Sequence, residues 1–211
     1  MRIVFAIHGI RSKKIGNWVF DFVNFAKKDS RFENEIFVPY TYGFIPAILS
    51  VHPVFKYQSV KRVMRVLRKL KSQHPDADLN IVAHSYGTEL SFQAIKRSGE
   101  DGKSPIKVNK LILVSSIVSC HREIPYNDTL RPRKIKELHC YCSYEDEVCR
   151  YNPFGHSGFR GFSRSAYDRT CYPKPFDDLE ICNHQVKILE HSDYFKGDKY
   201  YKEWLDIIAK G

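Results

Sequence analysis

The sequence predicts an α/β protein: a doubly wound, mostly parallel sheet of about six strands with helices on both faces, in three layers. Two observations carry this prediction. Short apolar runs of strand length alternate with segments whose apolar residues recur at helical spacing, as is typical of a parallel sheet covered on both sides. In addition, the stretch 79–90 (LNIVAHSYGTEL) passes from an apolar run through a serine into a predicted helix.

The expected elements follow one another along the whole chain. Strands are expected at 3–7, 36–40, 79–83, 107–115, 138–143 and 179–189, and helices at 17–28, 59–72, 88–97 and 198–209. Helix 59–72 has one apolar and one basic face, which we interpret as a solvated outer helix rather than a nucleic-acid or membrane patch. Segment 41–57 is apolar but broken by proline and glycine, so it is expected to form a lid or a buried crossover. Segment 151–175 is expected to be a long loop near the site.

Composition narrows the class of protein. The 211 residues are expected to form a single domain over 1–211, and 43% hydrophobic with 14% aromatic residues excludes a disordered chain. A formal charge of +10 and a pI near 9.3 favour anionic partners such as a phospholipid surface or an acidic substrate. Nucleic acid is not expected as a partner, because the sequence contains no recognised nucleic-acid-binding motif.

Localisation and thiol chemistry follow from two further patterns. The start, MRIVFAIH, enters a predicted strand at once and lacks the apolar run and cleavage site of a signal peptide, and no segment is long enough to span a membrane. We therefore expect a cytoplasmic protein with reduced thiols. Buried structural thiols are favoured over a zinc site with His121, His139 or His184, and no metal or cofactor is expected. The cysteines are Cys120, Cys140, Cys142, Cys149, Cys171 and Cys182.

The stretch 79–90 has the pattern of a nucleophile elbow. Ala83-x-Ser85-x-Gly87 differs from the usual G-x-S-x-G in its first residue only, and alanine is also small. Small residues are needed on both sides because the strained turn brings the strand and the helix start almost into contact. The turn also places the Tyr86 N–H at a helix N-terminus, where unpaired donors can stabilise developing negative charge. Ser85 is therefore the candidate nucleophile.

Partners for this serine are sought after later strands. A serine hydroxyl needs a histidine to remove its proton and a carboxylate to orient that histidine, and both should follow the carboxyl ends of strands. His191 follows the last predicted strand, and Glu145, Asp146 and Glu147 follow the strand before it. The order Ser85, Asp146, His191 matches the Ser…Asp…His order of one known fold, while Glu145 and Glu147 remain alternatives to Asp146.

Four segments together resemble a small α/β-hydrolase, nearest to the serine esterase and lipase branch: HGI at 8–10, AHSYG at 83–87, SYEDEV at 143–148 and HSD at 191–193. The resemblance implies that Ser85 is the nucleophile, His191 the general base and Asp146 its orienter, since the family's acid is usually followed closely by a valine. It also implies an oxyanion hole from the backbone N–H groups of Ile10 and Tyr86. The chain departs from the family by lacking its leading antiparallel strands and by having only a short lid insertion.

The resemblance further implies hydrolysis of a carboxylic ester or lipid-like acyl substrate through an acyl-enzyme, without a cofactor. The apolar stretch 41–55 favours a hydrophobic acyl chain. Two alternatives remain open, namely a catalytically inactive binding protein and a thioesterase or amidase of the same fold. His8 is expected to brace the oxyanion loop, and His84 to support the site rather than act as the base.

Overall fold

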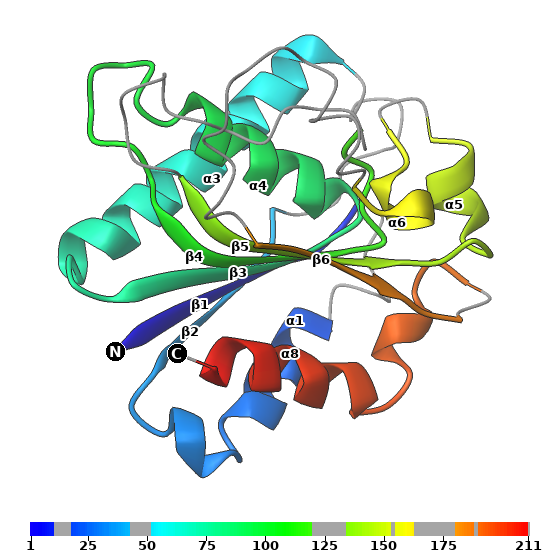
Figure 1. Ribbon diagram of the computed structural model, residues 1–211. Helices are drawn as coiled ribbons and strands as arrows, with labels where there is room; N and C mark the ends of the chain where they lie inside the picture. The colour runs from blue at the N-terminus through cyan, green and yellow to red at the C-terminus, as the bar shows by residue number, and fades with distance from the viewer. Residues whose placement is uncertain are drawn as a thin grey trace.

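The structure is a computed structural model that describes residues 1–10, 18–42, 52–119, 134–152, 155–162, 180–187 and 190–210. A single six-stranded sheet runs through it with helices on both faces (Figure 1). The strand order is β2-β1-β3-β4-β5-β6, and every neighbouring pair is parallel. The predicted fold class and strand number are thereby confirmed.

All six expected strands are present. They are β1 (Arg2–Ile7), β2 (Ile36–Tyr40), β3 (Asp78–His84), β4 (Val108–Val114), β5 (Ile135–Cys142) and β6 (Glu180–Gln185). The central strands β1, β3 and β4 are almost fully buried, which explains why they appear in the sequence as near-continuous apolar runs. Pro39 is tolerated in β2 because β2 lies at an edge of the sheet, where a missing N–H costs no ladder bond on the open side.

Helices cover both faces of the sheet (Figure 1). α3 (Pro53–Gln73) and α4 (Tyr86–Arg97) lie on one face, and α1 (Trp18–Ala26) and α8 (Lys199–Ala209) lie on the other. Side chains alternate along β3, so that Leu79 and Ile81 pack toward α3 and α4 while Val82 packs toward α1 and α8. The shorter helices are η1 (Ser30–Phe32), α5 (Glu147–Arg150), α6 (Ser157–Arg160) and η2 (Asp193–Phe195).

The first turn of α3 corrects one expectation. The sequence predicts this helix over 59–72, but it begins at Pro53, so residues 53–57 of the expected lid or crossover are helical. A proline fits the first helical turn, since its missing N–H would have no partner there. The apolar face is buried and most of the basic side chains are exposed, as predicted for an outer helix. Residues 43–51 of the expected lid lie outside the described residues.

The expected loop 151–175 also needs correction where the structure describes it. Residues 157–160 form the short helix α6, which four residues are too few to reveal by periodicity. Residues 153–154 and 163–175 of this segment, together with Cys120, His121 and Cys171, lie outside the described residues. Cys140, Cys142 and Cys149 are buried free thiols, as expected, whereas Cys182 is partly exposed. No helix among the described residues combines the length and apolarity that crossing a membrane requires.

Candidate active site

Ser85 occupies a sharp turn between β3 and α4. Its backbone angles, φ 53° and ψ −124°, lie in a region that residues with a side chain rarely adopt. The Ser85 N–H donates to the Val114 carbonyl oxygen at 3.1 Å, and the Ser85 carbonyl accepts from the Thr88 N–H at 2.9 Å. The turn is therefore held by β4 on one side and by the first turn of α4 on the other. Such a strained strand-to-helix turn is the geometry of a nucleophile elbow.

Two glycines allow the chain to pack against this turn. A Cβ atom at Gly87 would lie 2.6 Å from the His8 carbonyl oxygen, and one at Gly9 would lie 2.8 Å from Ser85 Cβ. Neither position has room for a side chain, so the segment that follows β1 passes directly beside Ser85. The predicted oxyanion donors, the N–H groups of Ile10 and Tyr86, belong to the two segments that meet here.

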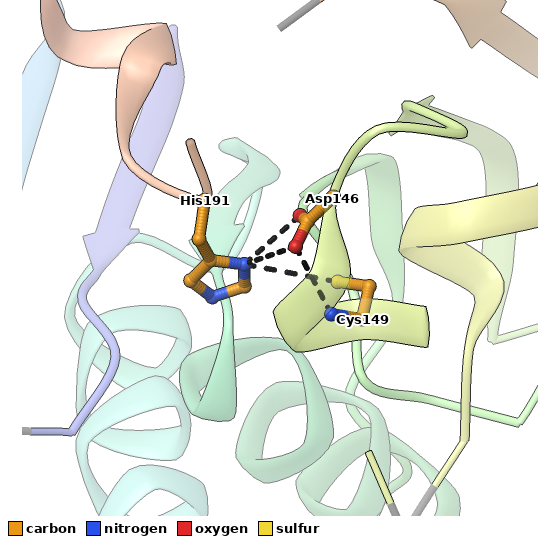
Figure 2. A group of neighbouring side chains, drawn as sticks. All are labelled: Asp146, Cys149 and His191. Atoms are coloured by element: carbon orange, nitrogen blue, oxygen red, sulfur yellow. Dashed lines mark hydrogen bonds and ion pairs between the residues drawn. The ribbon is translucent and has the colours of Figure 1, made fainter. Parts of the chain in front are cut away.

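Asp146 and His191 are in direct contact. His191 Nδ1 lies 2.9 Å and 3.0 Å from the two carboxylate oxygens of Asp146 (Figure 2). Asp146 also caps α5, because its Oδ1 accepts from the Cys149 N–H at 3.0 Å. Burial opposes ionisation of Asp146, but its hydrogen bonds with His191, the Cys149 N–H and Ser115, and the charge of His191, outweigh this and lower its pKa to about 2. The carboxylate is therefore ionised at neutral pH.

The two alternative acids lie elsewhere. The side chains of Glu145 and Glu147 are exposed, while that of Asp146 is fully buried. Glu145 and Glu147 line a cleft of about 360 Å³ together with Val148, Glu190 and His191. Of the three neighbouring carboxylates, Asp146 is thus the one that the structure brings to the imidazole, and the other two form the wall of a cleft beside it.

The second ring nitrogen of His191 is turned away from Asp146 (Figure 2). This Nε2 atom is buried and has no hydrogen-bond partner in the part of the chain that the structure describes. The His191 ring lies 4.8 Å from the ring of His84, the residue before Ser85. Because Ser85 follows β3, Asp146 follows β5 and His191 follows β6, all three lie at the carboxyl edge of one parallel sheet.

Comparison with known proteins agrees with this fold. A family described as "alpha/beta hydrolase of unknown function (DUF900)" matches residues 55–151, which include Ser85 and Asp146. A gene product of Listeria innocua is similar in structure, with a TM-score of 0.60 at 12% identity over 100% of this chain and 95% of that one. A candidate α/β-hydrolase of unknown function from Agrobacterium tumefaciens has a TM-score of 0.57 at 12% identity over 98% and 84% of the two chains. The chain has the α/β-hydrolase fold.

The thioesterase RedJ of the prodiginine pathway of Streptomyces coelicolor is similar as well, with a TM-score of 0.56 at 10% identity over 98% of this chain and 85% of that one. No curated protein sequence matches the chain. Matches at this level of identity define the fold, and together with the matching family they support a hydrolase. The substrate of this chain does not follow from them.

Two further histidines support the candidate site. His84 is buried, hydrogen-bonds through Nε2 with the His191 carbonyl oxygen at 3.1 Å, and packs edge-on against Phe195. Burial, reinforced by the charge of His191, lowers the pKa of His84 to about 3, so this ring stays neutral. His8 stacks on Tyr42 with ring centroids 4.5 Å apart, and the Tyr42 hydroxyl donates to the His8 carbonyl at 2.8 Å. Both histidines therefore hold backbone in place.

Sequence reasoning did not identify two residues at this site. Ser115 follows β4, has a positive φ of 44° and donates to the His191 carbonyl at 3.2 Å. Cys149 places its Sγ atom 3.8 Å from His191 Nδ1. The available signals were weak: Ser115 ends a strand at the same edge of the sheet, and Cys149 lies one helical turn after Asp146. Among the described residues, Asp146, Cys149 and His191 form the one close group of three potential metal ligands.

Proposed function

We propose that the protein is a serine hydrolase that cleaves a carboxylic ester through Ser85, His191 and Asp146. One observation carries the proposal. Buried Asp146 contacts Nδ1 of His191, and the other ring nitrogen, Nε2, has no hydrogen-bond partner among the described residues. This pair lies at the same edge of the sheet as the strained turn of Ser85. A histidine oriented in this way, at the sheet edge where a serine occupies a sharp turn, is the arrangement that activates a hydroxyl as a nucleophile.

The reaction begins with proton transfer from Ser85 to His191. As Nε2 takes the hydroxyl proton, Oγ bonds to the ester carbonyl carbon and the carbonyl electron pair moves onto oxygen. Asp146 stabilises the imidazolium that forms. When the tetrahedral intermediate collapses, the bond to the alcohol oxygen breaks and Nε2 returns the proton to that oxygen. A water molecule then attacks the acyl-enzyme in the same way, which releases the acid and restores Ser85.

The oxyanion is assigned to the N–H groups of Ile10 and Tyr86. Tyr86 is the first residue of α4, so its N–H lies at the positive end of a helix. The close approach of Gly9 to Ser85 supports a second donor from the segment after β1. Loss of one such donor costs about 2.7–4 kcal/mol of transition-state stabilisation.

An apolar acyl group is the substrate feature that we favour. Val54 and Phe55 in the first turn of α3 are 59% and 48% exposed, and Val148 lines the cleft beside His191 with 50% exposure. Exposed apolar side chains of this size are typical of surfaces that receive a hydrophobic ligand. The basic, solvent-facing side of α3 would suit an anionic surface that presents such a substrate.

Labelling with a fluorophosphonate, followed by intact-mass analysis and peptide mapping, tests this function. We expect one adduct on Ser85 and none in Ser85→Ala or His191→Ala. Ser91→Ala is the matched control, because Ser91 is a buried serine of α4 whose hydroxyl has no partner among the described residues. This variant should label and turn over ester like the unaltered protein.

The same experiment separates the alternatives. A folded protein that forms no adduct would be a binding protein with the α/β-hydrolase fold, and the proposal would be wrong. An adduct on Ser85 without ester turnover, but with turnover of thioesters or amides, would keep the nucleophile and change the substrate class.

A further inference from the structure

Three side chains that offer different ligand atoms meet beside the proposed nucleophile. Asp146, Cys149 and His191 place a carboxylate oxygen, a sulfur and an imidazole nitrogen within 4.8 Å of one another. Figure 2 shows all three directed toward the same point, from the end of β5, from α5 and from the segment after β6. Asp146 and Cys149 are buried, and His191 is largely so. The proposed hydrolysis uses the carboxylate and the imidazole but leaves the thiol without a role.

We propose that Asp146, Cys149 and His191 form an inhibitory binding site for Zn²⁺, with the carboxylate, the thiolate and Nδ1 as ligands. Sulfur, imidazole nitrogen and one carboxylate are ligands that zinc accepts together, whereas Mg²⁺ and Ca²⁺ favour sets made of oxygen alone. A fourth position is left for water. The proposal that the ion binds depends only on the geometry of the three side chains. The proposal that the ion inhibits rests on the proposed function.

The distances are close to those that zinc requires. With bonds of about 2.0–2.2 Å to nitrogen and oxygen and about 2.3 Å to sulfur, tetrahedral ligands lie about 3.4 Å (nitrogen to oxygen) and about 3.6 Å (nitrogen to sulfur) apart. His191 Nδ1 lies 2.9 Å from Asp146 Oδ2 and 3.8 Å from Cys149 Sγ. These two distances differ from the tetrahedral values by about 0.5 Å and about 0.2 Å, and the oxygen and sulfur ligands lie within 4.8 Å of each other.

Binding of the ion rearranges two protons. Without metal, the Nδ1–H group of His191 donates to Asp146, and Cys149 is a buried free thiol. Zinc bonds to the sulfur as its proton leaves for solvent, and to Nδ1 as the proton of the neutral ring moves to Nε2. One proton is released for each ion, and the two positive charges of zinc are balanced by carboxylate and thiolate.

This tautomer explains the inhibition. Nε2 carries a proton when Nδ1 is bound to zinc, so it has no lone pair to accept the proton of Ser85. The metal-free ring has the opposite arrangement and can act as a base. Zinc would thus inactivate the site without touching Ser85.

The cleft beside His191 provides a route for a cation. Glu145, Glu147 and Glu190 line it, and His191 forms part of its wall. Glu190 is paired with Lys196 at 3.4 Å, so Glu145 and Glu147 are the carboxylates that raise the local concentration of divalent cations at this opening, although the whole chain has a formal charge of +10. An accessible route of this kind is one of the requirements for a functional metal site.

Titration of the metal-free protein with Co²⁺ tests the site without any substrate. We expect one ion per chain and a near-ultraviolet absorption band from cobalt–thiolate bonding, which competing Zn²⁺ removes. Cys149→Ser should abolish the band and weaken binding about tenfold or more, as loss of a ligand requires. Cys142→Ser is the matched control, because Cys142 is another buried cysteine in the same core as Cys149. If Cys149→Ser does not fold, Cys149→Ala replaces it as the variant that lacks the sulfur ligand.

Ester turnover provides the second readout. Zn²⁺ should inhibit the unaltered protein reversibly, and a chelator should restore turnover. In Cys149→Ser the fraction of turnover that Zn²⁺ inhibits, measured against the zinc-free turnover of the same variant, should be much smaller. Absence of the cobalt band, or equal zinc affinity in Cys149→Ser, would overturn the site. If His184→Ala, and not Cys149→Ser, lost the ion, the binding site would be at His139 and His184, whose ring nitrogens lie 3.1 Å apart. That result would also overturn the proposed site. A Co²⁺ band in a protein without hydrolase activity would keep the metal site and refute the proposed function.

Discussion

The two halves of the candidate site are built in different ways. On the nucleophile side, backbone packing fixes the geometry: Ser85 has a positive φ, and Gly9 and Gly87 lie where no side chain fits. On the acid–base side, the link between Asp146 and His191 is a contact between side chains from segments 45 residues apart. Added volume should therefore damage the first half and changes of charge or protonation the second. The predictions below test this difference.

Asp146→Asn should have the largest effect. The amide can donate to Nδ1 and so favours the tautomer with its proton on Nε2, and in a comparable triad this change lowers kcat about 10⁴-fold. We expect an effect of that order on ester turnover, with the fold retained. Glu147→Gln is the control, because Glu147 is exposed beside the same cleft and should leave kcat nearly unchanged. A larger loss in Glu147→Gln than in Asp146→Asn would assign the acid to Glu147.

Gly87→Ala tests the nucleophile side. The new Cβ would meet the His8 carbonyl at 2.6 Å and the Ile7 carbonyl at 2.9 Å, both of them backbone atoms. We expect destabilisation of about 1–3 kcal/mol in urea unfolding, together with loss of Ser85 labelling. Gly102→Ala is the control, because its new Cβ would meet no atom within 4 Å and the variant would be destabilised only by the positive φ at this position. Labelling of Ser85 in this variant should be unchanged. Normal labelling in Gly87→Ala would mean that the elbow tolerates added volume.

Acid should remove the stabilisation that comes from the buried carboxylate. Folding lowers the pKa of Asp146 from 3.8 to about 2, so its contribution is present above the unfolded value and is lost as pH falls through the folded one. The shift corresponds to about 2 kcal/mol. The difference in unfolding free energy between the unaltered protein and Asp146→Asn should therefore shrink by about that amount between pH 5 and pH 2. A difference that does not depend on pH would contradict an ionised Asp146.

Ser115→Ala should have the smallest effect. The change removes a hydroxyl that contacts the His191 carbonyl oxygen and also hydrogen-bonds with Asp146, and one such hydrogen bond is worth about 1 kcal/mol of stability. We expect kcat to fall by less than tenfold, because His84 still hydrogen-bonds with the same carbonyl. Thermal unfolding and ester kinetics, with Ser91→Ala measured in parallel, check both parts. A loss as large as that of Asp146→Asn would give Ser115 a direct role in catalysis.

The sequence predicts the sheet well because its central strands are buried on both faces and therefore appear as uninterrupted apolar runs. It predicts the elbow for a similar reason, since the small residues and the serine are local. The start of α3 was missed because Pro53 was interpreted as a helix breaker, although a proline is accepted in a first turn.

The acid–base half could be predicted only in part. Three consecutive carboxylates look alike in sequence, and what separates Asp146 from its neighbours is burial and the cap it provides for α5. The positions of Ser115 and Cys149 near His191 depend on how separate strands end at one edge of the sheet. No spacing along the chain encodes that proximity.

The carbonyl oxygen of His191 is held by two groups that do not change charge over the ordinary range of pH. One is the Ser115 hydroxyl, and the other is His84, whose pKa of about 3 keeps its ring neutral. The backbone of His191 should therefore stay anchored when the pH changes. Activity lost on mild acidification should return as soon as the solution is neutralised, with no lag for refolding.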